Sequence, residues 1–107
     1  MENDRRKSAR VPMVAHIEVL DESTDTRLKS RVSDISRDGC YLDMVNPLPS
    51  GTPVRLSITS GDETFRARGR IVYSVQHMGA GVSFEEIEPQ CVPVLQTWLA
   101  EAGKKPW

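Results

Sequence analysis

The spacing of apolar residues constrains the fold most, because they alternate with polar residues in short runs along most of the chain. Residues 53–60 give the clearest example, with Val54, Leu56 and Ile58 alternating with polar or charged neighbours. Successive side chains of a strand point to opposite faces, so such a run predicts a strand with one buried face. Similar runs, each bounded by turn residues, predict further strands at 12–20, 27–35, 40–44, 65–75 and 81–84.

The longest of these runs is residues 65–75, and its pattern predicts a core face and a solvent face along its whole length. The predicted core face carries Phe65, Ala67, Gly69, Ile71, Tyr73 and Val75. The predicted solvent face carries Arg66, Arg68 and Arg70. Such a stripe is typical of an exposed strand face, and whether one of the three borders a ligand stays open at this point.

After Pro89 the apolar period changes from that of a strand to that of a helix. Val92, Leu95, Trp98, Leu99 and Ala102 recur at helical spacing, which predicts one amphipathic helix over residues 89–102. Its apolar stripe suits the open end of a barrel. Six short strands followed by one helix therefore predict an all-β fold, a small antiparallel barrel with one C-terminal helix packed on it.

Length and composition predict a single cytoplasmic domain. The chain has 107 residues, which suits one domain, and its apolar share of 38% and charged share of 27% are ordinary for a globular protein. No apolar run is long enough to span a bilayer, and residues 1–10 show no secretory signal. Within domain 1–107 we expect a mobile tail at 1–10, the barrel at 11–84 and the helix at 89–102. Cys40 and Cys91 are expected to be buried thiols rather than a disulfide.

Charge and motifs argue against several classes of function. The formal net charge is −1, which does not indicate a surface for DNA or RNA. His16 and His77 have no partners at metal-ligand spacing, so no metal site is expected. Ser36 lacks the context of a nucleophile, and no phosphate-binding loop occurs, so the chain is not expected to be an enzyme. Positive charge is concentrated locally, in residues 5–10, which fits a small anion better than a polymer.

Two short motifs carry a resemblance to a known family. The first is RRKSAR at residues 5–10, which contains RxxxR and leads into the first expected strand. The second is DISRDG at residues 34–39, a DxSxxG in the turn between the second and third expected strands. In this order, and together with GRIVY at 69–73 and GVSF at 81–84, they resemble the PilZ domain family. The resemblance covers about residues 5 to 100, which is nearly the whole chain.

The resemblance implies a six-stranded split barrel and a ligand, the bacterial second messenger cyclic di-GMP. A guanidinium offers bidentate donors to phosphate or to a guanine edge and can stack on a purine. A carboxylate can accept from guanine N1–H and N2–H₂, and a glycine permits close backbone approach. The implied ligand residues are Arg5, Arg6, Arg10, Asp34, Ser36 and Gly39. No other cofactor is implied.

The signalling output is less constrained by these residues. We expect the ligand to close residues 1–10 over the 34–39 turn, and an unidentified downstream protein to read the result. The chain is expected to be a monomer or a homodimer, without membrane insertion. Two alternatives stay open: a PilZ-like adaptor that binds a protein but no nucleotide, and a small barrel that binds single-stranded nucleic acid. The second would need aromatic residues interleaved with basic ones, and the chain has only six aromatics (Trp 2, Tyr 2, Phe 2).

Overall fold

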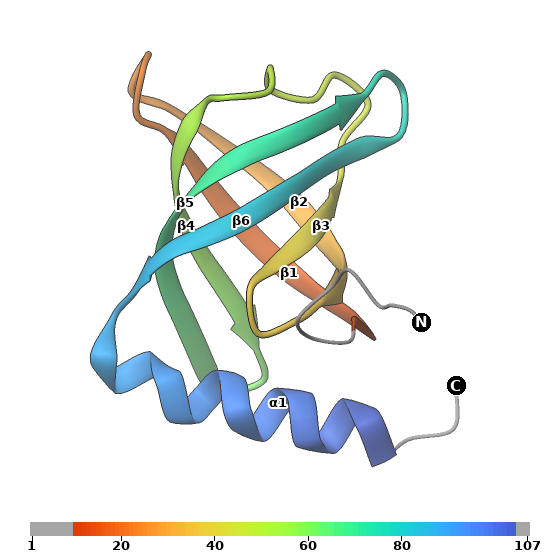
Figure 1. The fold of residues 1–107 in the computed structure, drawn as a ribbon, viewed down its shortest axis with the longest axis vertical. Coiled ribbons are helices and arrows are strands. Elements are labelled where there is room, and N and C mark those ends of the chain that lie inside the picture. Colours follow the sequence, from red (N-terminus) through yellow and green to blue (C-terminus); the bar gives the residue numbers. More distant parts are fainter. Residues whose placement is uncertain (1–9, 105–107) are drawn as a thin grey trace, which may run out of the picture.

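Six antiparallel strands close into a barrel, and one helix lies across one end of it (Figure 1). The computed structural model describes residues 10–104. The elements in chain order are β1 (Val11–Asp21), β2 (Thr26–Ile35), β3 (Gly39–Asp43), β4 (Pro53–Ser60), β5 (Glu63–Val75), β6 (Gly79–Ile87), a 3₁₀ turn at Pro89–Cys91 and α1 (Val92–Lys104). Around the barrel the strand order is β1-β2-β3-β6-β5-β4. The predicted fold class is thereby confirmed.

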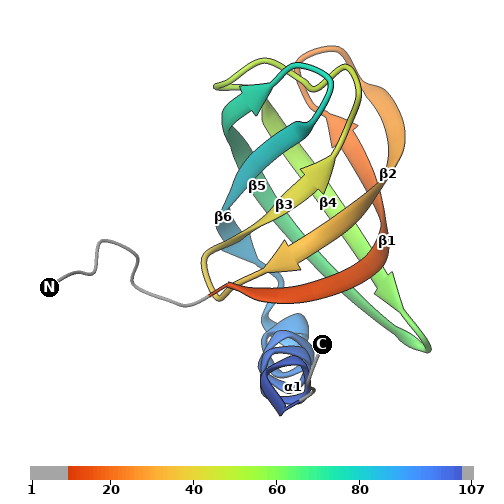
Figure 2. The same cartoon turned by 90° about the vertical axis from the view of Figure 1, so that its right-hand side faces the viewer.

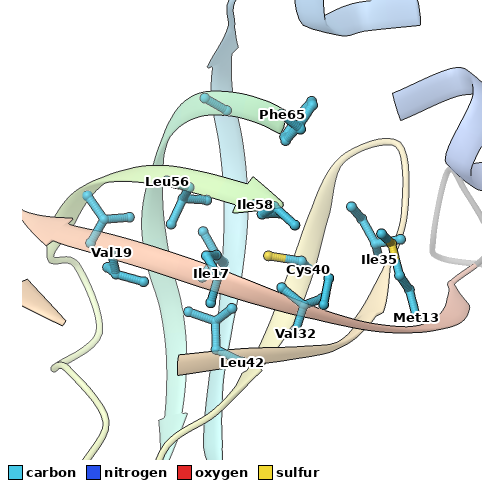
Figure 3. Close-up of a cluster of buried hydrophobic side chains, with 14 of the residues drawn as sticks. Met13, Ile17, Val19, Val32, Ile35, Cys40, Leu42, Leu56, Ile58 and Phe65 are labelled. Carbon is cyan, nitrogen blue, oxygen red and sulfur yellow. The ribbon is translucent and has the colours of Figure 1, made fainter. Parts of the chain in front are cut away.

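The alternating apolar residues form the core of the barrel, as their spacing predicts. On β4, Val54, Leu56 and Ile58 are buried while Arg55 and Thr59 are exposed. Inside the barrel they pack against buried residues of the neighbouring strand β1 and of β2 and β3 (Figure 3). Burying each large side chain contributes roughly 1.5–3 kcal/mol. The largest fully buried side chains are Phe65, Ile35, Leu42, Ile58, Ile71, Val19, Val32 and Val54.

Helix α1 closes the barrel end through an aromatic contact. The Trp98 ring lies 6.2 Å from the Phe65 ring, centroid to centroid, and its Nε1 donates a hydrogen bond of 3.0 Å to Glu63 Oε1. The buried Cys91, just before the helix, accepts the backbone N–H of Arg66 at its Sγ. These contacts fix the helix on the β4–β5 hairpin. Within residues 10–104 no helix is long and apolar enough to cross a membrane.

The predicted core face of β5 is wrong at its end. Ile71 pairs with Val82, but Tyr73 pairs with Gly81, so the register shifts between Ile71 and Tyr73. A β-bulge places one extra residue in one strand and reverses which face the following side chains occupy. Tyr73 and Val75 therefore leave the core and are 38% and 41% exposed. Alternation alone cannot reveal this, because the bulge residue Val72 is as apolar as its neighbours.

Candidate functional site

The start of β1 and the β2–β3 turn lie side by side on one side of the barrel (Figure 2). Val11 pairs with Ile35 and Pro12 with Asp34, so the residue that precedes β1, Arg10, lies near the end of β2. The two motifs are thus brought together at their described residues. Arg5 and Arg6, and the predicted closure of the tail, lie outside the described residues.

Asp34 holds an unsatisfied acceptor. It lies on β2 opposite Tyr41 of β3, just after a register shift that follows Val32. The carboxylate oxygen Oδ1 is buried and has no hydrogen-bond partner among the described residues. Leaving a buried polar group unpaired costs about 1–3 kcal/mol. This oxygen is therefore an unmet hydrogen-bond acceptor.

Arg10 places a permanent positive charge beside this acceptor. Its guanidinium is exposed, and its pKa is raised by a hydrogen bond to Tyr73, with smaller favourable contributions from the charges of Tyr73 and Asp34. An arginine remains protonated across the physiological range, so the shift reports proximity and has no titration consequence. Arg10, Asp34 and Tyr73 therefore form one cluster drawn from the approach to β1, from β2 and from β5.

The β2–β3 turn that carries the DxSxxG motif is built around Ser36. Ser36 is 7% exposed, and its Oγ accepts the backbone N–H groups of Asp38 and Gly39, each at 3.2 Å. Its own N–H donates to the Gly39 carbonyl at 2.8 Å. In this structure the hydroxyl holds the turn in shape, and direct contact with a ligand remains a prediction for this residue.

Gly39 is required by close packing of the turn against β6. A Cβ at this position would lie 2.0 Å from the Val82 carbonyl oxygen, a backbone atom that cannot swing away. The N–H of Phe84 also donates to the Asp38 carbonyl at 2.8 Å, which fastens the turn to β6. The turn is therefore held rigidly beside the Asp34 carboxylate.

Two tyrosines that the sequence reasoning did not assign to the site complete it. The rings of Tyr41 and Tyr73 lie 6.2 Å apart, centroid to centroid, and are tilted by 34°. Between them runs β6, whose glycines make room: a Cβ at Gly81 would lie 2.3 Å from the Tyr73 ring, and one at Gly79 would lie 2.9 Å from the Tyr41 ring. Burial and the neighbouring Tyr73 raise the pKa of Tyr41, so its hydroxyl stays protonated. The result is a small aromatic surface next to Arg10 and Asp34.

One sequence feature, Gly79-x-Gly81, could have indicated that aromatic rings pack here. Two glycines on one face of a strand leave space that aromatic side chains of neighbouring strands can fill. Assigning Tyr73 to that space requires the bulge in β5, which the sequence does not show.

Other chemistry finds little support nearby. The Cys40 thiol is buried on β3, and burial raises its pKa, so it is a poor nucleophile. Residues 10–104 contain no group of His, Cys, Asp or Glu side chains that could hold a metal ion. What this face offers is an acceptor, a cation and aromatic surface.

The architecture defines the class of protein: a small antiparallel barrel closed by one helix, with a polar and aromatic face beside the β2–β3 turn. The family model of the PilZ domain matches residues 4–101. The chain therefore belongs to the PilZ domain family. Among curated proteins no sequence gives a significant match.

Solved structures share this fold. The Bacillus subtilis inhibitor of motility, MotI/DgrA, is similar with a TM-score of 0.76 and 15% identity over 97% of this chain, which spans 55% of that protein's chain. The PilZ domain of CeSA from a cellulose-synthesizing bacterium gives a TM-score of 0.69 and 22% identity, and the match covers 87% of this chain and 99% of that one. The PilZ domain of YcgR from Escherichia coli, in a structure with c-di-GMP, gives a TM-score of 0.70 and 12% identity. The match covers 94% of this chain and 93% of that one. Identities this low establish similarity of fold only.

Proposed function

We propose that this chain is a cytoplasmic receptor for cyclic di-GMP, and not an enzyme, with its site on the outer face around Asp34. The observation that carries the proposal is the buried Oδ1 of Asp34, which lies next to the Arg10 guanidinium and has no hydrogen-bond partner within residues 10–104. Membership of the PilZ family supports the choice of ligand, as does the similarity in fold to the YcgR domain whose structure contains c-di-GMP.

Asp34 reads the base in this proposal. Guanine presents two adjacent donors, N1–H and N2–H₂, and a carboxylate with a free acceptor can take them. Adenine lacks this pair of donors, so the same carboxylate discriminates against cyclic di-AMP. A ligand donor at Oδ1 would also remove the cost of leaving that oxygen unpaired.

Arginine and tyrosine side chains bind the rest of the ligand. Arg10 donates to a phosphate or to a guanine edge, and Arg5 and Arg6 add further guanidinium groups from the preceding segment. The exposed Tyr73 ring, held over Gly81, provides a face on which a purine stacks. Ser36 and Gly39 fix the shape of the turn that holds the ligand against the barrel.

Calorimetric titration with cyclic di-GMP, cyclic di-AMP and cyclic GMP tests the proposal. We expect saturable binding of cyclic di-GMP and clearly weaker binding of cyclic di-AMP. Arg10→Ala should weaken cyclic di-GMP binding about tenfold or more, because a charge-assisted hydrogen bond is lost. Arg6→Lys should also weaken it, because an ammonium cannot make the bidentate or stacked contact. Tyr73→Ala should weaken binding through loss of stacking.

The base-reading role has a matched control. Asp34→Ala should weaken binding of cyclic di-GMP and narrow its preference over cyclic di-AMP. Asp62→Ala removes an exposed carboxylate from the β4–β5 turn and should leave both affinities unchanged. Equal loss for both nucleotides in Asp34→Ala would mean that Asp34 only shapes the turn.

The output would pass to an unidentified downstream protein, through the surface that forms when ligand is bound. Absence of any nucleotide binding in the titration would favour the alternative, a PilZ-like adaptor that binds a protein directly. Binding of an oligonucleotide instead would favour a nucleic-acid-binding barrel.

A further inference from the structure

A polar groove of about 350 Å³ lies on the outside of the barrel, away from the candidate site. It runs over β4, which is directly across from β3 in the closed strand order, whereas Tyr41 and the β2–β3 turn belong to β3 and its surroundings. The groove is centred on Ser57, which lies between Glu18 of β1 and Arg66 of β5 in the paired register. A short side chain flanked by long ones produces the hollow.

Charged side chains surround this hollow, with positive charge in excess. Arg27, Arg55 and Arg66 line it, against two glutamates, Glu18 and Glu88. The apolar floor includes Leu20 and Leu56. This count covers only the residues that line the groove, so the ion pairs decide which arginine is left without a carboxylate.

The ion pairs show which arginine is available. Arg55 pairs with Glu22 at 2.5 Å, Arg68 with Glu22 and Glu86 at 3.6 Å each, and Arg70 with Glu85 at 3.1 Å. Arg27 pairs loosely with Glu18 at 3.7 Å.

Arg66 differs from all of these, since its guanidinium makes no ion pair or hydrogen bond with any of the described residues. The Ser57 hydroxyl beside it likewise makes no hydrogen bond within the described part of the chain. A cation and a hydroxyl donor, adjacent across two paired strands, are therefore both unused.

We propose that this groove is a second binding site, which takes a single oxyanion group, a carboxylate or a phosphate, between Ser57 and Arg66. The guanidinium supplies two parallel donors in the geometry of an oxyanion, and the serine hydroxyl supplies a third. Arg27 of β2 and Arg55 of β4 also line the groove, but both already pair with glutamates, so Arg66 supplies the charge for the anion. The site is independent of the proposed nucleotide site, since the two share no residue.

The test uses two simple probes, inorganic phosphate and acetate, each titrated at constant ionic strength against sodium chloride. Backbone amide shifts in ¹⁵N-labelled protein report occupancy residue by residue. We expect saturable shifts at Ser57, Arg66 and their strand neighbours, and none of comparable size in chloride. Saturation by phosphate alone assigns a phosphate group, by acetate alone a carboxylate, and by both an oxyanion in general.

Two arginines of the same strand form the matched pair. Arg66→Ala should raise the half-saturating probe concentration about tenfold or more, because an unpaired guanidinium is removed. Arg70→Ala removes an arginine that already pairs with Glu85, and it should change the half-saturating probe concentration by less than twofold. Arg66→Gln serves as a second variant if Arg66→Ala loses its folded spectrum. Shifts that do not saturate, or equal effects of the Arg66 and Arg70 substitutions, would overturn the proposal.

Discussion

Two aspartates of the barrel show how differently one residue type can be used. Asp21 is 6% exposed and accepts hydrogen bonds from the Ser23 N–H at 2.9 Å and the Ser23 hydroxyl at 2.6 Å. Asp34 instead has a buried oxygen, Oδ1, with no partner in the described part of the chain. Asp21 holds the β1–β2 turn together, whereas Asp34 carries an unmet acceptor at the proposed ligand face.

This contrast predicts opposite effects on stability in the ligand-free protein. Asp34→Ala should raise the free energy of unfolding by about 1 kcal/mol, because an unsatisfied buried acceptor is removed. Asp21→Ala should lower it by about 1 kcal/mol, because two hydrogen bonds to a carboxylate are lost. Urea unfolding followed by circular dichroism measures both. A loss in Asp34→Ala equal to that in Asp21→Ala would show that Asp34 is a structural residue.

The pH dependence of stability gives a second test of the role of Asp21. Hydrogen bonds from Ser23 hold the pKa of the Asp21 carboxyl below its usual value of 3.8. A group with a lowered folded pKa binds more protons in the unfolded state, so its contribution to stability is present above the unfolded pKa. That contribution is lost as pH falls through the folded pKa. The difference between wild type and Asp21→Ala should therefore shrink on acidification below about pH 4.

At the scale of elements, β6 supports the candidate site by bringing its backbone close to neighbouring groups. Gly39 packs against its backbone, and Gly79 and Gly81 leave room for the two tyrosine rings. A side chain at any of these positions would push a neighbouring strand or ring away. The geometry of the site therefore depends on the absence of side chains at Gly79 and Gly81 of β6 as much as on the residues that contact a ligand.

Gly39→Ala should consequently destabilise the protein by about 3 kcal/mol, because the added Cβ meets a backbone oxygen at 2.0 Å. The same substitution should weaken nucleotide binding, since the turn beside Asp34 must shift. Gly61→Ala in the β4–β5 turn is the matched control: its φ is +61°, but no atom lies within 4 Å of the added Cβ. Its cost should be about 1 kcal/mol, from backbone conformation alone. Thermal unfolding compares the two, and equal losses would contradict the close-packing argument.

The strands and the helix could be predicted from the sequence, but part of the site could not. Alternation predicted the strands and the change of period predicted the helix, because side-chain faces follow directly from residue spacing. The Asp34–Gly39 turn was predicted from its motif. The role of Tyr73 was not, because it depends on an extra residue at the β5 bulge and on its pairing with Gly81 across strands. Pairing between distant strands is set by the whole barrel, and a local pattern of residues does not contain it.

At the scale of the whole molecule, the closed barrel separates two outer faces. The proposed nucleotide face lies around β3 and β6, and the Ser57 groove lies over β4 on the opposite side. Every strand is paired on both sides, so moving one strand would disturb two ladders of backbone hydrogen bonds. Ligand binding should therefore act locally, at the segment that precedes β1 and at the β2–β3 turn.

Hydrogen exchange with and without cyclic di-GMP tests this expectation. Binding should slow exchange in residues 34–39 and in the segment that leads into Val11, because ligand contacts join the turn to the arginines there. The β4–β5 turn around Gly61, which contains none of the proposed ligand residues, should exchange at the same rate in both states and serves as the internal reference. Two results would contradict a local closing movement. The segment before Val11 could be equally protected without ligand, or protection could change throughout β4 and β5, in which case the barrel itself would carry the signal.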